Sequence, residues 1–459
     1  MTKSASLILL EFNELTPALV ERFMSEGELP NFKRFFQESR AYITDAEEAQ
    51  DKLNPWIQWV TVHSGLSFAE HGVFHLGEGH KLTRKCVWDL LSDANLRVWV
   101  CGSMNPRFDV PLNGYLLPDP WTTNVTPYPG ELLPYFRFVQ RNVQEHTNQH
   151  ARLTPAEYAT FVRFMVTHGL SAATAGSIVQ QLMRERLVGG RWKRAVLLDR
   201  LQWDVFQFYY HKLKPAFATF FLNSTAHLQH KYWRHMEPEH FTIKPTAEEQ
   251  AEYETAILFG YQQMDKLLAR FMELAGDDAT LVLCSALGQR PCLTYEDQGG
   301  KTFYRPRNFA DVLSFAGVNI PNKVSPVMSE QFHVLFDTEQ DAQRAEMQLH
   351  ALQVEDTPAM LVSREGAAIF SGCKVYRPLA KEAVLRAGSD RAARFFDLFY
   401  QADGIKSGMH DPDGFLWIRA PERRHSVCEG KVPLRSVAPT VLARLGVARP
   451  SYMRAQVLS

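Results

Sequence analysis

Two histidines near the middle of the chain have the spacing of shared metal ligands. His227 and His230 stand three residues apart, so in a helix their imidazoles would lie close together and could bind one cation. Histidine pairs with this spacing also occur on helix surfaces, hydrogen-bonded and without a metal. Both interpretations require a helix at this position.

A carboxylate within an apolar strand is the second candidate for chemistry. Glu11 interrupts the run 7–12, which otherwise contains leucine, isoleucine and phenylalanine. Alternation along a strand puts Glu11 and Asn13 on the same face. A buried carboxylate without a partner costs roughly several kcal/mol. Glu11 therefore needs an arginine, a histidine or a metal ion, and an ordinary ion pair and a metal site both meet that need.

The elements that would position these side chains alternate along the chain. Runs rich in β-branched and aromatic residues are separated by segments whose apolar residues recur at helical spacing. This pattern predicts a three-layer α/β sandwich with a mostly parallel central sheet, whose carboxyl edge is the place for a ligand. The clearest predicted strands are 7–12, 97–101, 217–222 and 280–284, and the clearest predicted helices are 17–24, 29–37, 246–274 and 435–445.

Two segments interrupt the alternation. Residues 127–214 are expected to form a helical cap insertion, whose many aromatic rings either hold it to the core or shape a substrate site. Residues 321–378 are expected to form a smaller α+β segment with strands at 331–336 and 359–363. The α/β core is then made of residues 1–126, 215–320 and 379–459.

The composition describes a globular chain with balanced charge. Its 459 residues include 50 lysines and arginines and 51 aspartates and glutamates, and 45% of them are hydrophobic. This balance gives no overall field that would gather nucleic acid or an anionic membrane, so we expect a small-molecule partner, no nucleic acid and no membrane. The first apolar run is short and has no cleavage site after it, and the six cysteines show no CxxC spacing. We therefore expect a cytoplasmic protein with reduced thiols.

Several separated motifs follow one recognisable order. They are the first strand with the Leu-Pro-Asn phrase at 29–31, residues 64–73, residues 230–233, residues 408–410, and a closing strand and helix at 415–418 and 437–446. In order and spacing they resemble the alkaline phosphatase superfamily, in particular its type I phosphodiesterase and nucleotide pyrophosphatase branch. The resemblance implies the sandwich fold and a site for metal-assisted cleavage of phosphate esters.

The resemblance also implies two metal sites, and the first has lost its ligands in this chain. The aspartate that follows the first strand in the family is Asn13 here, and the family's aspartate-histidine pair is Ala286 and Leu287. An amide is a much weaker zinc ligand than a carboxylate, and apolar side chains do not bind cations. We therefore expect no two-metal centre.

The nucleophile of the family is missing as well. Aligning Ser64 and Gly65 with the family's threonine-glycine pair puts Asn54 or Pro55 where the attacking hydroxyl belongs. Neither residue has a hydroxyl. Thr61 and Ser64 could serve only if the helix were shifted, and otherwise they are ordinary helix residues.

The second metal site is partly retained. The resemblance makes His230 and His410 its histidines, while the aspartate that would join them is Ala226. His227, Glu11 and Asn13 are possible additional ligands, and two histidines with one carboxylate and a water match an open catalytic zinc site. Polar residues at strand ends are candidates for ligand binding: Asn223, Ser224, Ser285 and Gln289.

Three functions remain open. The first is a hydrolase or transferase that acts on a phosphate or related ester with one divalent cation, zinc or manganese. The second is an inactive or metal-free family member that binds a small ligand or a protein partner in the old cleft. The third is catalysis without metal, with a histidine as general base. We rank the first ahead, because the retained histidines otherwise lack a role. Its catalytic candidates are Asn54, Thr61, Asn13 and Glu11.

Overall fold

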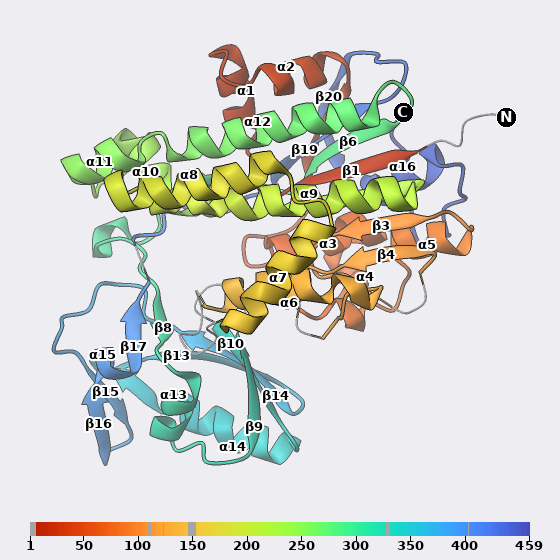
Figure 1. Ribbon diagram of the computed structural model, residues 1–459. Helices are drawn as coiled ribbons and strands as arrows, with labels where there is room; N and C mark the ends of the chain where they lie inside the picture. The colour runs from red at the N-terminus through yellow and green to blue at the C-terminus, as the bar shows by residue number, and fades with distance from the viewer. Residues whose placement is uncertain (1–5, 109–111, 123, 146–152, 327–330, 403) are drawn as a thin grey trace.

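The largest sheet of the computed structural model has eight strands (Figure 1). The structure describes residues 6–108, 112–122, 124–145, 153–326, 331–402 and 404–459. The strand order is β20-β2-β19-β6-β1-β5-β3-β4, and β19 runs antiparallel to both of its neighbours. The prediction of a mostly parallel central sheet is confirmed. The strands are β1 (Leu7–Phe12), β2 (Arg40–Asp45), β3 (Val98–Cys101), β4 (Gly114–Leu117), β5 (Phe217–Leu222), β6 (Thr280–Ser285), β19 (Asp413–Arg419) and β20 (Ser426–Pro433).

Helices cover both faces of this sheet. Every residue of β1 and β5 is buried, which explains why these strands are almost entirely apolar instead of alternating. Two hydrophobic clusters, one on each face, give the three layers that the sequence predicts. One face carries α1 (Pro17–Ser25), α2 (Pro30–Gln37), α9 (Ala195–Leu213), α10 (Ser224–Met236) and α12 (Ala256–Ala275), and the other carries α3 (Pro55–Ser64), α5 (Val87–Asp93) and α16 (Val437–Arg444).

The Leu-Pro-Asn phrase has a structural role at the start of α2. Asp265 of α12 accepts hydrogen bonds from the backbone amides of Asn31 and Phe32 at 2.9 and 2.8 Å, and from Asn31 Nδ2 at 2.7 Å. These bonds satisfy amide groups that the first turn of a helix leaves without partners. The single helix predicted over 246–274 is two helices, α11 (Ala247–Tyr253) and α12, because the chain leaves helical geometry between them.

The helix-rich segment packs against the sheet instead of standing apart from it. Phe206 of α9 lies edge-on to Phe220 of β5, with ring centroids 5.1 Å apart, and Trp203 lies edge-on to Phe271 of α12 at 4.7 Å. These rings therefore hold the segment to the core, which is the first of the two roles considered for them. The segment also contains η2 (Gly130–Leu132), α6 (Leu133–Glu145), α7 (Pro155–Thr167), α8 (Ala172–Val188) and η3 (Arg191–Arg194).

A third hydrophobic cluster marks a smaller α+β unit, below the sheet in Figure 1. The cluster runs from Tyr304 to Phe399, a longer span than the predicted 321–378. The unit is inserted between β7 (Gly288–Pro291) and β18 (Gly408–Asp411), which pair with each other antiparallel. Its elements are β8 (Tyr304–Pro306), α13 (Phe309–Ala316), β9 (Asn322–Pro326), β10 (Gln331–Phe336), α14 (Glu339–His350), β11 (Leu352–Val354), β12 (Thr357–Pro358), β13 (Met360–Glu365), β14 (Ala368–Cys373), β15 (Val384–Ala387), β16 (Arg391–Arg394), α15 (Phe395–Leu398) and β17 (Phe399–Gln401).

Short helical turns complete the described chain: α4 (Phe68–His71), η1 (Gly79–Lys81), η4 (Pro238–His240), η5 (Glu296–Gln298) and η6 (Leu434–Ser436). None of the helices in the described ranges combines the length and apolar character that a membrane span requires.

Candidate metal centre

Three side chains of the kind that bind metals converge at the carboxyl edge of the sheet. Glu14 follows β1, His230 lies on α10 and His410 lies on β18. Glu14 Oε2 is 3.0 Å from His230 Nε2 and 3.6 Å from His410 Nε2. Because β1 and β5 are parallel, the turn after β1 and the helix after β5 meet at this edge.

The turn that aims Glu14 is held by hydrogen bonds from distant parts of the chain. Glu14 has a φ of 59°, a left-handed conformation uncommon for a residue with a side chain. Its carbonyl accepts from Gln229 Nε2 at 2.6 Å, and Gln229 Oε1 in turn accepts from the Tyr261 hydroxyl at 2.7 Å. Asn13 Nδ2 donates to Glu14 Oε1 at 2.9 Å, and Gln289 Nε2 donates to Oε2 at 2.5 Å. The carboxylate is therefore fixed before any ligand binds.

Backbone carbonyl groups set the orientation of both imidazoles. His230 Nδ1 lies 2.9 Å from the Gly408 carbonyl oxygen, and His410 Nδ1 lies 2.6 Å from that of Leu53. A carbonyl oxygen only accepts, so each Nδ1 carries a hydrogen and each Nε2 is turned away from the backbone. Both Nε2 atoms face the same carboxylate oxygen. Electron-rich atoms at this spacing repel one another unless a proton or a cation lies between them.

The protonation states also suit a metal. Burial alone would raise the pKa of Glu14, but positive charge on His410 and His230 and the hydrogen bonds to the carboxylate lower it to about 2. Burial lowers the pKa of His410 to about 4, against the attraction of the Glu14 carboxylate. At neutral pH Glu14 is therefore a carboxylate and His410 a neutral imidazole, which are the states that metal binding requires.

The three donor atoms fit one divalent cation. Tetrahedral zinc has bonds of about 2.0–2.1 Å to nitrogen and oxygen, so its ligand atoms lie about 3.3 Å apart. The distances from Glu14 Oε2 to the two Nε2 atoms, 3.0 and 3.6 Å, lie on either side of that value. The side chains of Glu14, His410 and His230 are 2%, 13% and 28% exposed, so the cluster is open to solvent on the His230 side. Three protein ligands with one open position are typical of a catalytic site, and manganese also accepts this donor set.

Glu11 is paired elsewhere. Its side chain is fully buried, and Oε1 lies 2.9 Å from Nε2 of the equally buried His63. Of the two partners expected for Glu11, the structure therefore shows the side-chain pair and not the metal site. Glu11 is not in the group formed by His230 and His410. The physical reason is its position: Glu11 lies in register with Phe221 and Cys284 inside the sheet, whereas the histidines lie beyond the strand ends.

Sequence reasoning missed Glu14, whose carboxylate meets His230 and His410 where that of Glu11 was considered. The available signal was an acidic residue two positions after the first strand, in a chain that has alanine at position 226, where the resemblance implies an aspartate. His227 also lies outside the group and is exposed on α10. His230 therefore meets a histidine from another element, not its neighbour on the same helix.

A hydrogen-bond chain occupies the place of the other metal site implied by the resemblance. Trp59 Nε1 donates to Asn13 Oδ1 at 2.7 Å, and Asn13 Nδ2 donates to Asn223 Oδ1 at 2.7 Å. Ala286 and Leu287 are fully buried beside these strand ends. The Asn13 oxygen already has a donor and its nitrogen has two acceptors, so this amide has nothing to offer a cation.

The remaining candidates have local partners. The backbone N–H of Asn54 donates to Gln58 Oε1 at 2.9 Å at the start of α3, and Thr61 Oγ1 lies 3.3 Å from His71 Nε2. Ser285 Oγ donates to the Leu287 carbonyl oxygen at 2.9 Å, and Ser224 Oγ donates to the carboxyl group of Asp199. Of the four residues expected to bind a ligand, Gln289 directly supports Glu14 and Asn223 supports Asn13.

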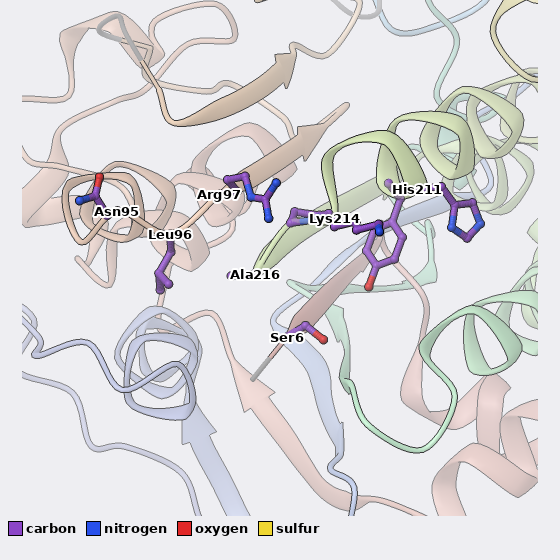
Figure 2. A pocket seen from close by; sticks show the side chains of 9 residues that line it. Ser6, Asn95, Leu96, Arg97, His211, Lys214 and Ala216 are labelled. Atoms are coloured by element: carbon purple, nitrogen blue, oxygen red, sulfur yellow. The ribbon is translucent and has the colours of Figure 1, made fainter. Parts of the chain in front are cut away.

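A separate cavity of about 390 Å³ lies at the opposite edge of the sheet (Figure 2). Its lining includes Ser6, Arg97 and Ala216, which immediately precede β1, β3 and β5. The metal-type cluster lies beyond the other ends of β1 and β5, so this cavity is not part of it.

Comparison with known proteins gives similarity of structure alone. No family model matches the chain, and no curated protein matches it. Among solved structures, the chain is similar to phosphonoacetate hydrolase from Sinorhizobium meliloti in complex with phosphonoformate, with a TM-score of 0.43, 11% identity, and 96% of each chain covered. It is also similar to murine ectonucleotide pyrophosphatase/phosphodiesterase 5, with a TM-score of 0.41, 8% identity, and coverage of 96% of this chain and 95% of that one. The wild-type alkaline phosphatase PafA gives a TM-score of 0.45, 11% identity, and coverage of 100% and 99%.

Proposed function

We propose that the chain is a hydrolase or group transferase that acts on a small phosphate or related ester with one divalent cation held by Glu14, His230 and His410. The observation that carries the proposal is the convergence of two imidazole Nε2 atoms on one carboxylate oxygen, at 3.0 and 3.6 Å. Zinc is the first choice of metal and manganese the second. The phosphate-ester substrate class rests on the motif resemblance.

The chain's own residues would prepare the site for this chemistry. A bound cation would polarise a phosphoryl oxygen and acidify a water molecule. Asn13 and Gln289 keep the Glu14 carboxylate from rotating, and carbonyl groups keep both rings facing the same point. The positive charge of Lys406 is felt at His410, so it would favour the anionic oxygens of a phosphate ester beside the cation. Because Asn54 and Pro55 have no hydroxyl, water or an acceptor molecule is the proposed attacking group.

Metal analysis of the purified full-length protein tests the proposal. We expect about one zinc or manganese per chain in the wild type, and loss of the metal in Glu14→Gln, His230→Ala and His410→Ala. His227→Ala is the matched control, because it removes an exposed imidazole from the same helix. Hydrolysis of p-nitrophenyl phosphate and its diester should fall in the same three variants. A wild type that takes up no zinc or manganese on reconstitution would contradict the proposal.

A second candidate is a family member that binds its ligand without cleaving it. The closed chain of Trp59, Asn13 and Asn223 and the missing hydroxyl at Asn54 favour this function. The two candidates differ in turnover. A protein that binds metal, melts at higher temperature with phosphate esters and yet releases no product would support the binder.

A further inference from the structure

Helix α8 is attached to the protein mainly through polar side chains. Its inward contacts are hydrogen bonds and an ion pair: Ser177 with Arg200, Gln181 with the Gly190 carbonyl, and Glu185 with Arg194. Thr174 is the buried residue of this helix, and Ile178 adds a partly buried apolar contact. A surface helix usually turns its apolar side to the core. In α8 most of the long apolar side chains face the other way.

The end of α8 exposes four large apolar side chains within one short stretch. Leu182 is 45% exposed, Met183 61%, Leu187 82% and Val188 75%. Single exposed apolar residues are common, but a contiguous group of them marks a surface that another body covers.

The same stretch is strongly basic. Residues 182–194, here named the α8 tip, contain five cationic residues and one acidic residue, Glu185, which is paired with Arg194. Arg184, Arg186 and Arg191 have no ion pair among the described residues, and all three are exposed. Burial and the neighbouring charge of Arg184 lower the pKa of Lys193, so the cations of the α8 tip lie close together. The near-neutral total charge of the chain conceals this local excess.

The charge of the α8 tip argues against a second copy of the chain as the partner. In a symmetric dimer the same patch of both copies meets at the axis. Two basic tips would then face each other, and like charges across an interface are unfavourable. A partner that carries negative charge at its surface and apolar groups beneath it could pair with the arginines and also bury the aliphatic side chains.

We propose that the α8 tip docks on an anionic lipid surface. Leu187 and Val188 would enter the boundary between headgroups and acyl chains, while Arg184, Arg186 and Arg191 would contact lipid phosphates. Long arginine side chains reach the headgroup level from an apolar face, which explains why cations and aliphatic residues alternate here. This mode of binding needs no spanning helix and is independent of the metal site.

Vesicle co-sedimentation of the full-length protein tests the proposal. We expect about tenfold or stronger binding to phosphatidylcholine vesicles that contain phosphatidylserine than to phosphatidylcholine alone, with loss of binding at high salt. Met183→Asp with Leu187→Asp should reduce binding about tenfold or more, and so should Arg184→Glu with Arg186→Glu.

The matched control lies on α14 of the smaller unit. Met347 is 63% exposed, close to the value for Met183, and Arg344 is an exposed arginine on the same helix. Arg344→Glu with Met347→Asp should leave binding unchanged, and circular dichroism melting should confirm that every variant folds. Three results would overturn the proposal: no binding to anionic vesicles, binding that survives both α8-tip variants, or a wild-type dimer that Met183→Asp with Leu187→Asp converts to a monomer.

Discussion

Two neighbouring clusters at the carboxyl edge of the sheet satisfy their polar side chains in different ways. Around Glu14, the Nε2 atoms of two histidines face one carboxylate oxygen, with each Nδ1 held by a backbone carbonyl group. Around Asn13, the indole of Trp59 and the amide of Asn223 close a continuous chain of hydrogen bonds. The first cluster offers three ligand atoms that could hold a cation, and the second has its polar atoms paired with one another.

The difference shows that a carboxylate from a distant part of the chain can lie where the resemblance implies a ligand at position 226. Position 226, where the resemblance expects an aspartate, is alanine, and the Glu14 carboxylate lies near it: Gln289 Nε2 donates both to Glu14 Oε2 and to the Ala226 carbonyl oxygen. The left-handed turn at Glu14 makes this reach possible. At the other implied site, buried Ala286 and Leu287 follow β6, and neither side chain can bind a cation.

The largest effect is expected from the buried pair behind the Asn13 cluster. His63→Ala would leave the Glu11 carboxylate buried without a partner, so we expect a loss of about 3–5 kcal/mol in the free energy of unfolding. Denaturant unfolding measures this loss, and the metal content of the folded fraction should not change. A variant that lost its metal but kept its stability would instead make Glu11 a ligand.

The next effect depends on pH and concerns Asp199, which accepts from Ser224 at the start of α10. Burial raises the pKa of Asp199 from its ordinary value of 3.8 to about 7. The folded state therefore holds this proton more tightly than the unfolded state, so the contribution to stability is full below pH 4 and declines as the pH rises to about 7. The decline amounts to about 4 kcal/mol. Asp199→Asn should remove this decline, and unfolding curves of wild type and variant at pH 5 and pH 8 would detect the difference. If the variant kept the pH dependence of the wild type, Asp199 would not be its cause.

Glu14→Gln should change metal affinity instead of folding. Replacing one of three ligands by a neutral amide is expected to weaken zinc binding by about 100-fold or more, which corresponds to about 3 kcal/mol. Competition with a chelating dye measures the affinity. Equal affinity in wild type and variant would show that the convergence around Glu14 is not a metal site.

The smallest effect should come from the satisfied cluster itself. Trp59→Phe would leave Asn13 Oδ1 buried without its donor, at a cost of about 1–3 kcal/mol. Thermal unfolding should show this loss, while zinc affinity stays within about twofold of the wild type. A large fall in affinity would mean that the two clusters act as one and would end the contrast between them.

The fold could be predicted because it depends on local patterns. Runs rich in apolar residues identified β1 and β5 as strands, and the parallel sheet they predict indicated that a ligand site lies at its carboxyl edge. Motif spacing predicted His230 and His410 as members of one site, and the structure places the two side chains together. The residue that joins them could not be predicted, because the role of Glu14 depends on a backbone angle and on contacts from Gln229 and Gln289, more than two hundred residues away. The choice between an ion pair and a metal site for Glu11 stayed open in the sequence for a similar reason: its partner, His63, is 52 residues away.

The smaller unit is inserted between two paired strands of the core, β7 and β18. The unit leaves and re-enters the core between two strands that are hydrogen-bonded neighbours, and the Cys292 amide donates to the Ser407 carbonyl oxygen at 2.7 Å where they meet. An insertion whose ends already touch adds no loop to be closed. A gene could therefore gain, lose or exchange this unit while His410 stays opposite Gln289, so the smaller unit is free to evolve at a different pace from the site.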